Sequence, residues 1–383
     1  MNRSYVGFDC LSLPPNFSGA GYYIYYLARE LLQHIRSFPI TILCTPKHAN
    51  LFSPYLQSGD KIISIPLKNR IHRLSFYELG LKKTLIREGI KLFHGTHYLC
   101  PPSNKNYIII TTFHDMGFFL HPHYYPIGKR MYFTKRMGAF LNRSERVVTI
   151  SRSTLEAISN LFPEFAEKIS VIYPGADHLL NESSRSDSSE DAHKPYILAV
   201  NSVERRKNIP FVLKVFDHLK SKFSIKHEFV LVGHIANGFK EVLREIDQTK
   251  FSADIQLRLS IPLGQLNNYY RNADFFINAS NYEGFGFSPL EAINYQLPTF
   301  LFRNQIVKEL FGEHPYAFDD WDIKKWAQSI YEEMQSGFPN KITPERIKRL
   351  TWNNTATKFI ELYEELMSTS EINSIKKESL VAS

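Results

Sequence analysis

The sequence has little cysteine and no long apolar run. The three cysteines among its 383 residues, Cys10, Cys44 and Cys100, show no Cys-x-x-Cys spacing, which suits a reducing compartment rather than a disulfide framework. No apolar stretch approaches the ~20 residues that span a bilayer. The opening residues, MNRSYVGFDCLSL, lack the basic, apolar and small-residue regions of a signal peptide. These absences predict a cytoplasmic protein.

Acidic residues are scarce in the first half of the chain. Residues 1–180 carry 21 Lys and Arg against 11 Asp and Glu, whereas residues 181–383 carry 25 against 27, so the net charge of +8 comes from the first half. Basic side chains gather at 68–87 and 129–146. This excess predicts an anionic partner, either a membrane surface contacted peripherally or a lipid-phosphate acceptor. Two solvated helix faces explain it equally well. Nucleic-acid motifs are absent, so no nucleic-acid partner is expected.

Short β-branched and aromatic runs alternate with helical patterns, which is typical of parallel sheets with crossover helices. The polar segment 181–194, NESSRSDSSEDAHK, divides the chain into two parts of domain size. We predict an α/β fold with domains at 1–180 and 195–366, a linker at 181–194, a last helix able to pack back on the first domain, and a frayed tail at 367–383. Strands are expected at 4–8, 41–44, 61–65, 91–94, 107–113, 146–150, 169–173, 196–200, 228–232, 255–259, 275–278 and 298–302, and helices at 22–35, 76–88, 128–142, 153–161, 211–220 and 352–366.

The segment 278–298, NASNYEGFGFSPLEAINYQLP, carries the strongest functional pattern. A predicted strand ends near Asn278, and a glycine-bearing loop leads to a helix with Pro289 in its first turn. Ser288 and Glu291 have the spacing of a capping box, with the serine as N-cap. Backbone amides at such a helix start favour a phosphate. Glu283 lies in the loop, where capping does not explain it, and a carboxylate there can bind a polyol.

A basic pair occupies a second strand-to-helix turn. In the segment 196–211, YILAVNSVERRKNIPF, Arg206 and Lys207 stand just before Asn208, a good N-cap, with Pro210 in the first helical turn. Two cations beside a helix start can clamp a diphosphate and neutralise the charge on a departing nucleotide. A solvated turn is the common alternative for such a pair.

The string from Glu283 to Glu291, EGFGFSPLE, resembles the Glu-x7-Glu signature of retaining family-4 glycosyltransferases. Arg206-Lys207-Asn208 is similar to the Arg-Lys-Asn motif of the same family. The resemblance implies the GT-B fold, two doubly wound Rossmann-like domains with a cleft between them. It also implies that Glu291 binds the nucleotide ribose, that Glu283 is catalytic beside the reacting carbon of the donor sugar, and that the diphosphate and sugar hydroxyls are held by Arg206, Lys207, Gly284, Phe285, Gly286 and Phe287.

Two N-terminal segments extend the resemblance. Gly19-Ala20-Gly21 opens a predicted helix and is similar to the glycine loop of the family, which approaches donor phosphate and acceptor. As a dinucleotide fingerprint it is incomplete, because Ile24 stands at the third glycine position. His114-Asp115 ends a predicted strand and resembles the His-Asp segment of the mannosyltransferase-like branch of bacterial surface-polysaccharide enzymes. The resemblance implies that His114 contacts a distal hydroxyl of the donor sugar, although a structural histidine is common at a strand end.

The sequence departs from the family pattern at two places. Asn201-Ser202 replaces the usual Gly-Arg or Gly-Thr after the strand, which removes the basis for one arginine contact. Asn294-Tyr295-Gln296 replaces small residues before the next strand. The second change is expected to reshape the packing beneath the loop without abolishing binding.

No metal cofactor is expected. Asp320-Trp321-Asp322 has the Asp-x-Asp spacing of metal-dependent GT-A enzymes but is interpreted as an acidic turn before a helix, and His121-Pro122-His123 lacks further ligands at zinc spacing. The resemblance implies a nucleotide-sugar donor, with GDP-mannose first and UDP- or dTDP-sugars open, and a growing glycan or lipid-diphosphate-linked saccharide as acceptor. The alternatives are a glycoside hydrolase with two carboxylates and a non-catalytic GT-B scaffold of a polysaccharide assembly pathway. An NAD oxidoreductase is disfavoured.

Overall fold

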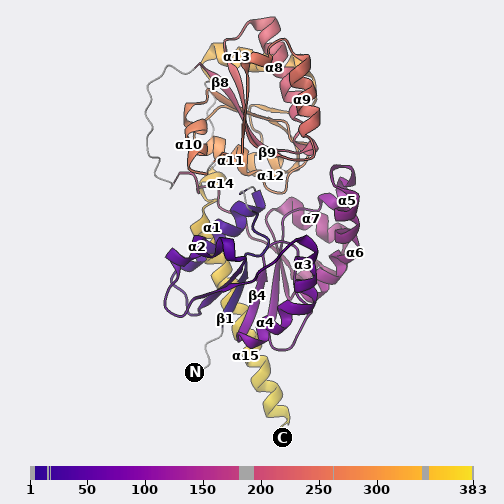
Figure 1. Ribbon diagram of the computed structural model, residues 1–383, viewed down its shortest axis with the longest axis vertical. Coiled ribbons are helices and arrows are strands. Elements are labelled where there is room, and N and C mark those ends of the chain that lie inside the picture. Colours follow the sequence, from indigo (N-terminus) through magenta and orange to yellow (C-terminus); the bar gives the residue numbers. More distant parts are fainter. Residues whose placement is uncertain are drawn as a thin grey trace. The chain divides into compact units, whose positions relative to one another are not determined.

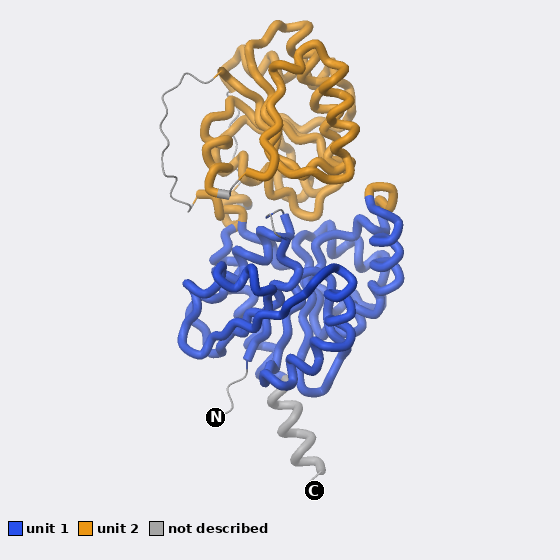
Figure 2. Tube along the Cα trace, in the orientation of Figure 1, with its two compact units in different colours: residues 1–120, 125–175, 351–383 blue, residues 121–124, 176–350 orange. Residues whose placement is uncertain are grey.

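The computed structural model describes residues 5–14, 17, 19–180, 194–261, 263–338 and 345–381, and their side chains except at 263, 346 and 370–381. The chain divides into two compact units, coloured separately in Figure 2. Unit 1 comprises Met1–Leu120, Tyr125–Gly175 and Thr351–Ser383, and unit 2 comprises His121–Tyr124 and Ala176–Leu350. The linker expected at 181–194, apart from its last residue, lies outside the described residues, as do the side chains of most of the tail expected at 367–383.

The described part of unit 1 holds a seven-stranded parallel sheet in the order β3-β2-β1-β4-β5-β6-β7. Its paired strands β1 and β4 are labelled in Figure 1. Its inner strands are buried runs rich in β-branched and aromatic residues, as parallel strands covered on both faces require, whereas the edge strands β3 and β7 are only partly buried. Each strand of the sheet lies within about two residues of a strand expected from the sequence, which confirms those predictions. The strands are β1 (Tyr5–Asp9), β2 (Ile40–Cys44), β3 (Lys61–Ser64), β4 (Ile90–Gly95), β5 (Ile108–Phe113), β6 (Arg146–Thr149) and β7 (Ile169–Val171).

The helices of unit 1 expected at 22–35, 128–142 and 153–161 are present, and the helix that begins at Trp352 continues beyond 366 to Val381. The four-residue helices α2 and α5 had not been predicted. The helix expected at 76–88 begins earlier, where the Asn69 side chain accepts a hydrogen bond from the His72 backbone amide (2.9 Å), and it contains a π-helical turn, η3 (Phe76–Gly80). The last helix packs against the first, with Tyr26 stacked on Trp352. The helices are α1 (Gly19–Gln33), α2 (Ala49–Phe52), α3 (Arg70–Ser75), α4 (Leu81–Arg87), α5 (Gly117–Leu120), α6 (Ile127–Arg143), α7 (Arg152–Leu161) and α15 (Trp352–Val381).

Unit 2 has, in its described residues, a six-stranded parallel sheet in the order β10-β9-β8-β11-β12-β13. The five longer strands confirm the sequence prediction, whereas the two-residue β13 and the helices α9, α10, α12 and α14 had not been predicted. The strands are β8 (Tyr196–Val203), β9 (Glu228–Ile235), β10 (Ile255–Leu259), β11 (Phe275–Asn278), β12 (Thr299–Phe302) and β13 (Ala317–Phe318). The helices are α8 (Ile209–Phe223), α9 (Phe239–Gln248), α10 (Leu263–Asn272), α11 (Phe287–Asn294), α12 (Gln305–Phe311), α13 (Ile323–Ser336) and α14 (Glu345–Lys348).

Both sheets are doubly wound, as expected for the fold class. The strand order reverses between β1 and β4 in unit 1 and between β8 and β11 in unit 2. In open α/β sheets, ligands bind outside the carboxyl ends of the strands at such a switch point. In unit 2 this position belongs to the loops that follow β8 and β11, which are the two segments singled out in the sequence.

Candidate active site

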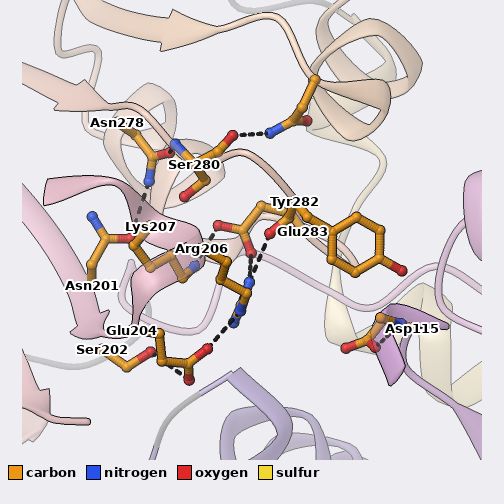
Figure 3. A network of polar contacts seen from close by, with 12 residues as sticks. Asp115, Asn201, Ser202, Glu204, Arg206, Lys207, Asn278, Ser280, Tyr282 and Glu283 are labelled. Carbon is orange, nitrogen blue, oxygen red and sulfur yellow. Dashed lines mark hydrogen bonds and ion pairs between the residues drawn. The ribbon is translucent and has the colours of Figure 1, made fainter. Parts of the chain in front are cut away.

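Two cations from the loop after β8 meet a carboxylate from the loop after β11 (Figure 3). Arg206 and Lys207 lie on the short 3-10 turn η6 (Arg205–Lys207), and Arg206 Nη1 is 2.8 Å from Glu283 Oε2. Lys207 Nζ pairs with the other oxygen, Oε1. Arg206 also donates to the Tyr282 carbonyl (2.9 Å), and its own carbonyl accepts from the Asn281 amide (2.8 Å). The two loops therefore form one connected site, as the sequence interpretation requires.

The charges of this cluster are buried and mutually stabilised. The side chains of Glu283, Lys207 and Arg206 are 9%, 10% and 18% exposed. Burial raises the pKa of the Glu283 carboxyl, but the charges of Lys207 and Arg206 outweigh it and lower that pKa to about 2. Burial lowers the pKa of Lys207, partly offset by Glu283. Glu283 is thus ionised throughout the physiological pH range.

A second carboxylate holds Arg206 from the other side. Glu204 Oε2 accepts from Arg206 Nε (2.6 Å), and Ser202 Oγ donates to Glu204 Oε1 (3.0 Å). Burial raises the pKa of Glu204, and the charges of Arg206 and Lys207 lower it by more. Sequence reasoning had not assigned Glu204 a role, although it lies two residues before Arg206.

Amide side chains fix the loop after β11 to its neighbours. Asn278 Nδ2 donates to Asn201 Oδ1 (3.2 Å), and Asn278 Oδ1 accepts from the Ser280 amide (3.0 Å). Asn304 Nδ2 donates to the Ser280 carbonyl (2.8 Å). Asn201, noted in the sequence only as a departure from the family pattern, is thus a structural support of the loop.

The capping box expected at Ser288 and Glu291 is wrong. Gly286 is the N-cap of α11, with φ of 85°, a left-handed conformation that glycine adopts without strain. This geometry starts the helix at Phe287, one residue before Ser288, so that Glu291 lies beyond the first turn. Glu291 is 2% exposed, and its Oε2 accepts a hydrogen bond from the Tyr270 hydroxyl (2.6 Å). The first-turn amides of α11 still point out of the helix at its N-terminus, as at any helix start.

The remaining predicted site residues lie in unit 1. His114 follows β5 and is buried, and its Nε2 donates to the Thr96 carbonyl (2.7 Å), so its Nδ1 is an acceptor. Burial lowers the pKa of His114, more than the Thr96 carbonyl and Asp115 raise it. Gly19 and Gly21 open α1 as predicted, and a Cβ on Gly21 would lie 3.0 Å from Pro14 Cγ.

Two further expectations concern metals and membranes. Within the described ranges, no group of three or more His, Cys, Asp or Glu residues is arranged to hold a metal ion. Asp322 is the N-cap of α13 and accepts from the Lys324 and Lys325 amides (2.9 and 3.1 Å), which confirms the acidic turn before a helix. Among the helices that the structure describes, none combines the length and apolar character needed to cross a bilayer.

Comparison with known families gives the class of the protein. Residues 17–178 match the model described as Glycosyltransferase Family 4, and residues 181–351 match the one described as Glycosyl transferases group 1. The two models adjoin and together cover most of the chain. The chain belongs to the group 1/family 4 glycosyltransferases and is a glycosyltransferase that uses nucleotide sugars.

Individual relatives are distant. The chain is 23% identical over 283 residues to O-antigen chain mannosyltransferase B of Escherichia coli, covering 71% of this chain and 74% of that protein. It is 23% identical over 303 residues to O-antigen chain mannosyltransferase RfbU of Salmonella typhimurium, covering 76% and 80%.

Solved structures share the GT-B fold. A sucrose-phosphate synthase from Thermosynechococcus elongatus superposes with a TM-score of 0.70 at 16% identity, covering 96% of this chain and all of that one. WaaG, a glycosyltransferase involved in lipopolysaccharide biosynthesis, has a TM-score of 0.65 at 12% identity, covering 96% and 99%.

Proposed function

We propose that this glycosyltransferase moves a hexosyl group with retention from a nucleoside diphosphate sugar to a growing glycan or lipid-linked saccharide. Mannose from GDP-mannose is the first candidate, supported by the mannosyltransferase names of relatives at 23% identity. The observation that carries the proposal is the buried cluster of Glu283, Arg206 and Lys207 at the switch point of the second sheet.

The cluster suits the departure of a diphosphate. Arg206 and Lys207 neutralise the charge that grows on the leaving phosphate, together with the first-turn amides of α11. Positive charge develops at the anomeric carbon, where the permanently ionised Glu283 stabilises it and orients sugar hydroxyls. The acceptor attacks the same face, and the leaving phosphate accepts its proton. Detection of a glycosyl adduct on Glu283 would contradict this sequence of steps.

Other residues orient the donor. Glu291 binds the ribose of the nucleotide, and the backbone of 284–287 holds diphosphate and sugar hydroxyls. His114 is neutral, and its Nδ1 accepts a hydrogen bond from a hydroxyl of the donor sugar. Gly19 and Gly21 allow close approach of the donor phosphate. No step requires a metal ion.

A donor screen tests the proposal. GDP, UDP and dTDP sugars are compared by thermal shift, where tight binding of one class raises the melting temperature. Lys207→Met is expected to weaken binding of the selected nucleoside diphosphate about 30-fold, because one charge-assisted contact is lost. Arg205→Gln is the matched control, since the neighbouring Arg205 pairs with the partly exposed Glu241. Equal losses in both variants would refute the diphosphate role.

Measurement of turnover distinguishes a catalyst from a non-catalytic scaffold. Glu283→Gln strongly lowers the rate of transfer if the chain is a catalyst. If the chain is a scaffold, partner binding is its function and no nucleoside diphosphate is released from any sugar donor by the unaltered protein.

We also propose that unit 1 docks on an anionic bilayer at the inner face of the membrane. Ile71, Leu79 and Ile127 are 76%, 75% and 67% exposed, on α3, η3 and α6. Glu78 of η3 pairs with Arg136 and Arg143 of α6, so the two helical segments are neighbours. Exposed apolar groups interleaved with basic ones are the pattern of interfacial binding. Other exposed members of this basic–apolar surface are Arg70, Lys83, Ile86, Arg87, Met131 and Lys135.

Vesicles test this surface. The protein should co-sediment with phosphatidylglycerol-containing vesicles, less so as salt rises. The pair Ile71→Glu and Leu79→Glu should abolish co-sedimentation, whereas Ile235→Glu, at a residue of unit 2 that is 62% exposed, should not. Salt-insensitive binding, or equal loss in the control, would refute the proposal.

A further inference from the structure

Residues 176–180, here called the strap, are fastened to α10 and α11 within unit 2. Asn294 Nδ2 donates to the Ala176 carbonyl (2.8 Å), and the Tyr295 hydroxyl donates to the Leu179 carbonyl (3.1 Å). The Leu179 carbonyl also accepts from Asn267 Nδ2 of α10 (3.0 Å). Three side chains therefore fix two backbone carbonyls of one short segment.

The two anchors on the α11 side are the residues at which this chain departs from the family pattern. Small residues are usual where Asn294 and Tyr295 stand, and small residues lack the reach and the donors for these contacts. The strap is therefore held by features of this chain.

Between its fastened carbonyls, the strap presents His178 to Glu291. His178 is fully buried, and its Nε2 lies 3.1 Å from Glu291 Oε1. The edge of the His178 ring also meets the Phe287 ring at a centroid distance of 6.1 Å. Glu291 is thus contacted from the strap on the side of Oε1.

Tyr270 of α10 holds the other oxygen. Its hydroxyl donates to Glu291 Oε2 (2.6 Å), and its ring stacks almost parallel on Tyr295, with centroids 5.4 Å apart. The strap anchor Tyr295 therefore also supports Tyr270. Oε2 is occupied, whereas Oε1 accepts no hydrogen bond from the residues that the structure describes. Oε1 is therefore the oxygen of Glu291 left for the proposed contact with a ribose hydroxyl.

We infer that Tyr270 and His178 are positioning residues that orient the Glu291 carboxylate toward the donor ribose, and that Asn294 and Tyr295 hold His178 in place through the strap. The inference rests on the proposed role of Glu291 in ribose binding. Tyr270 fixes the rotamer of the Glu291 carboxylate through its hydrogen bond to Oε2. His178 lies beside Oε1 and limits the movement of that oxygen. A carboxylate held in this way binds a diol without first losing side-chain freedom.

The test measures how much each residue contributes to binding of the ribose hydroxyls. Dissociation constants are measured by calorimetry for GDP, or for UDP if the donor screen selects it, and for the 2′,3′-dideoxy form of the same nucleotide. The unaltered protein should bind the ribose form at least 10-fold more tightly. In Tyr270→Phe this preference should fall to about two-fold, with the donor KM raised and kcat nearly unchanged. His178→Ala should behave likewise, and His178→Gln, which restores a donor, should recover part of the preference.

Variants of the anchors Asn294 and Tyr295 should lower the ribose preference in the same way, but by less. Asn294→Ala, combined with Tyr295→Phe to keep the stacked ring, should reduce the ribose preference about three-fold. Tyr316→Phe is the matched control, because the Tyr316 hydroxyl donates to Glu333 Oε2 (2.8 Å) in a similar tyrosine–glutamate pair of the same unit. It should leave the preference unchanged.

The outcomes separate the two proposals. If Glu291→Gln leaves the ribose preference of the unaltered protein intact, the ribose role of Glu291 fails. If Glu291→Gln removes the preference but Tyr270→Phe and His178→Ala lower the affinity for both nucleotides equally, these residues are merely structural and the positioning inference is overturned.

Discussion

The switch points of the two sheets carry buried carboxyl groups whose pKa values are shifted in opposite directions. In unit 2, Glu283 is paired with two cations, which lower the pKa of its carboxyl to about 2. In unit 1, burial raises the pKa of Asp9, at the end of β1, to about 6, although hydrogen bonds from Tyr77 and Leu11 oppose the shift. Burial also lowers the pKa of His94, on β4, to about 3. Desolvation acts on both edges, and only opposite charges at contact distance overcome it.

The groups at the edge of unit 1 are joined through hydrogen bonds rather than ion pairs. The Tyr77 hydroxyl, in the π-helical turn, donates to Asp9 Oδ2. His94 contacts the Tyr363 hydroxyl through Nδ1 (2.5 Å) and the Thr112 hydroxyl through Nε2 (2.7 Å). Burial disfavours the charged forms of Asp9 and His94 at this edge, which suits hydroxyl groups as ligands, whereas the ion-paired edge of unit 2 suits a diphosphate. The comparison supports separate duties for the two units in sugar transfer.

The largest effect should come from removing the charge of Glu283. Glu283→Gln keeps the shape of the side chain, so we expect kcat to fall about 1000-fold because stabilisation of the developing positive charge is lost. The measurement is the initial rate of nucleoside diphosphate release from the selected donor. Glu241→Gln, which removes an exposed ion pair in the same unit, should retain activity. A fall in kcat of less than 10-fold in Glu283→Gln would show that transfer does not depend on the charge of Glu283.

The same variant has a stability signature. The pKa of Glu283 is lower in the folded chain than its ordinary value of 4.5, so its ionised form stabilises the fold above about pH 4.5, and this contribution is lost as pH falls toward 2. Glu283→Gln should therefore be less stable by about 3 kcal/mol at pH 7. In urea unfolding, this difference from the unaltered protein should already narrow at pH 3.5. A difference that stays constant with pH would contradict the ionised pair.

The contribution of Asp9 to stability should change with pH in the opposite direction to that of Glu283. Its pKa is raised from 3.8 to about 6, so the folded chain binds a proton more readily than the unfolded chain, and stability falls as pH rises through this interval. Asp9→Asn should stabilise the fold at pH 7.5 by up to about 3 kcal/mol, and the gain should vanish near pH 4. Thermal unfolding at several pH values measures this. Destabilisation at pH 7.5 would show that the buried charge is compensated.

His114 should produce the smallest change. His114→Ala should lower kcat/KM about 10-fold, the value of one hydrogen bond to the donor sugar. Because the pKa of His114 is lowered, the pH profile of kcat/KM between pH 6.5 and 8 should have the same shape in both proteins. A step near pH 6.5 that disappears in the variant would show instead that His114 titrates as an ordinary histidine.

The fold was predictable because its strands are local patterns. Buried runs such as those of β5 and β9 are visible in the sequence, and so is the restart of the alternation after residue 194. The charged part of the site was predictable for the same reason, since Arg206 and Glu283 each follow a strand, and neighbouring parallel strands end at the same edge. The short helices α9, α10 and α12 were missed among loops of mixed composition.

The details of the site depend on contacts that local patterns do not contain. Ser288 and Glu291 have the spacing of a capping box, but the left-handed Gly286 starts the helix earlier and Tyr270 takes one oxygen of Glu291. The supports His178 and Tyr270 come from other segments of the chain, and nothing near either residue in sequence marks its partner. Asn201 and Asn294 were visible only as departures from a family pattern, and the structure shows what each contacts.

Unit 1 is built from segments of the chain that unit 2 interrupts, and this imposes an order on folding during synthesis. Trp352 and Tyr363 of α15 complete the packing around α1 and His94, yet they are translated after all of unit 2. At ~5–20 residues per second, the roughly 190 residues from Gly175 to Leu366 occupy the ribosome for about 10–40 s. During this interval the nearly contiguous unit 2 can finish folding, while the part of unit 1 that α15 later covers stays exposed to water. The first half of the protein is therefore the last to mature.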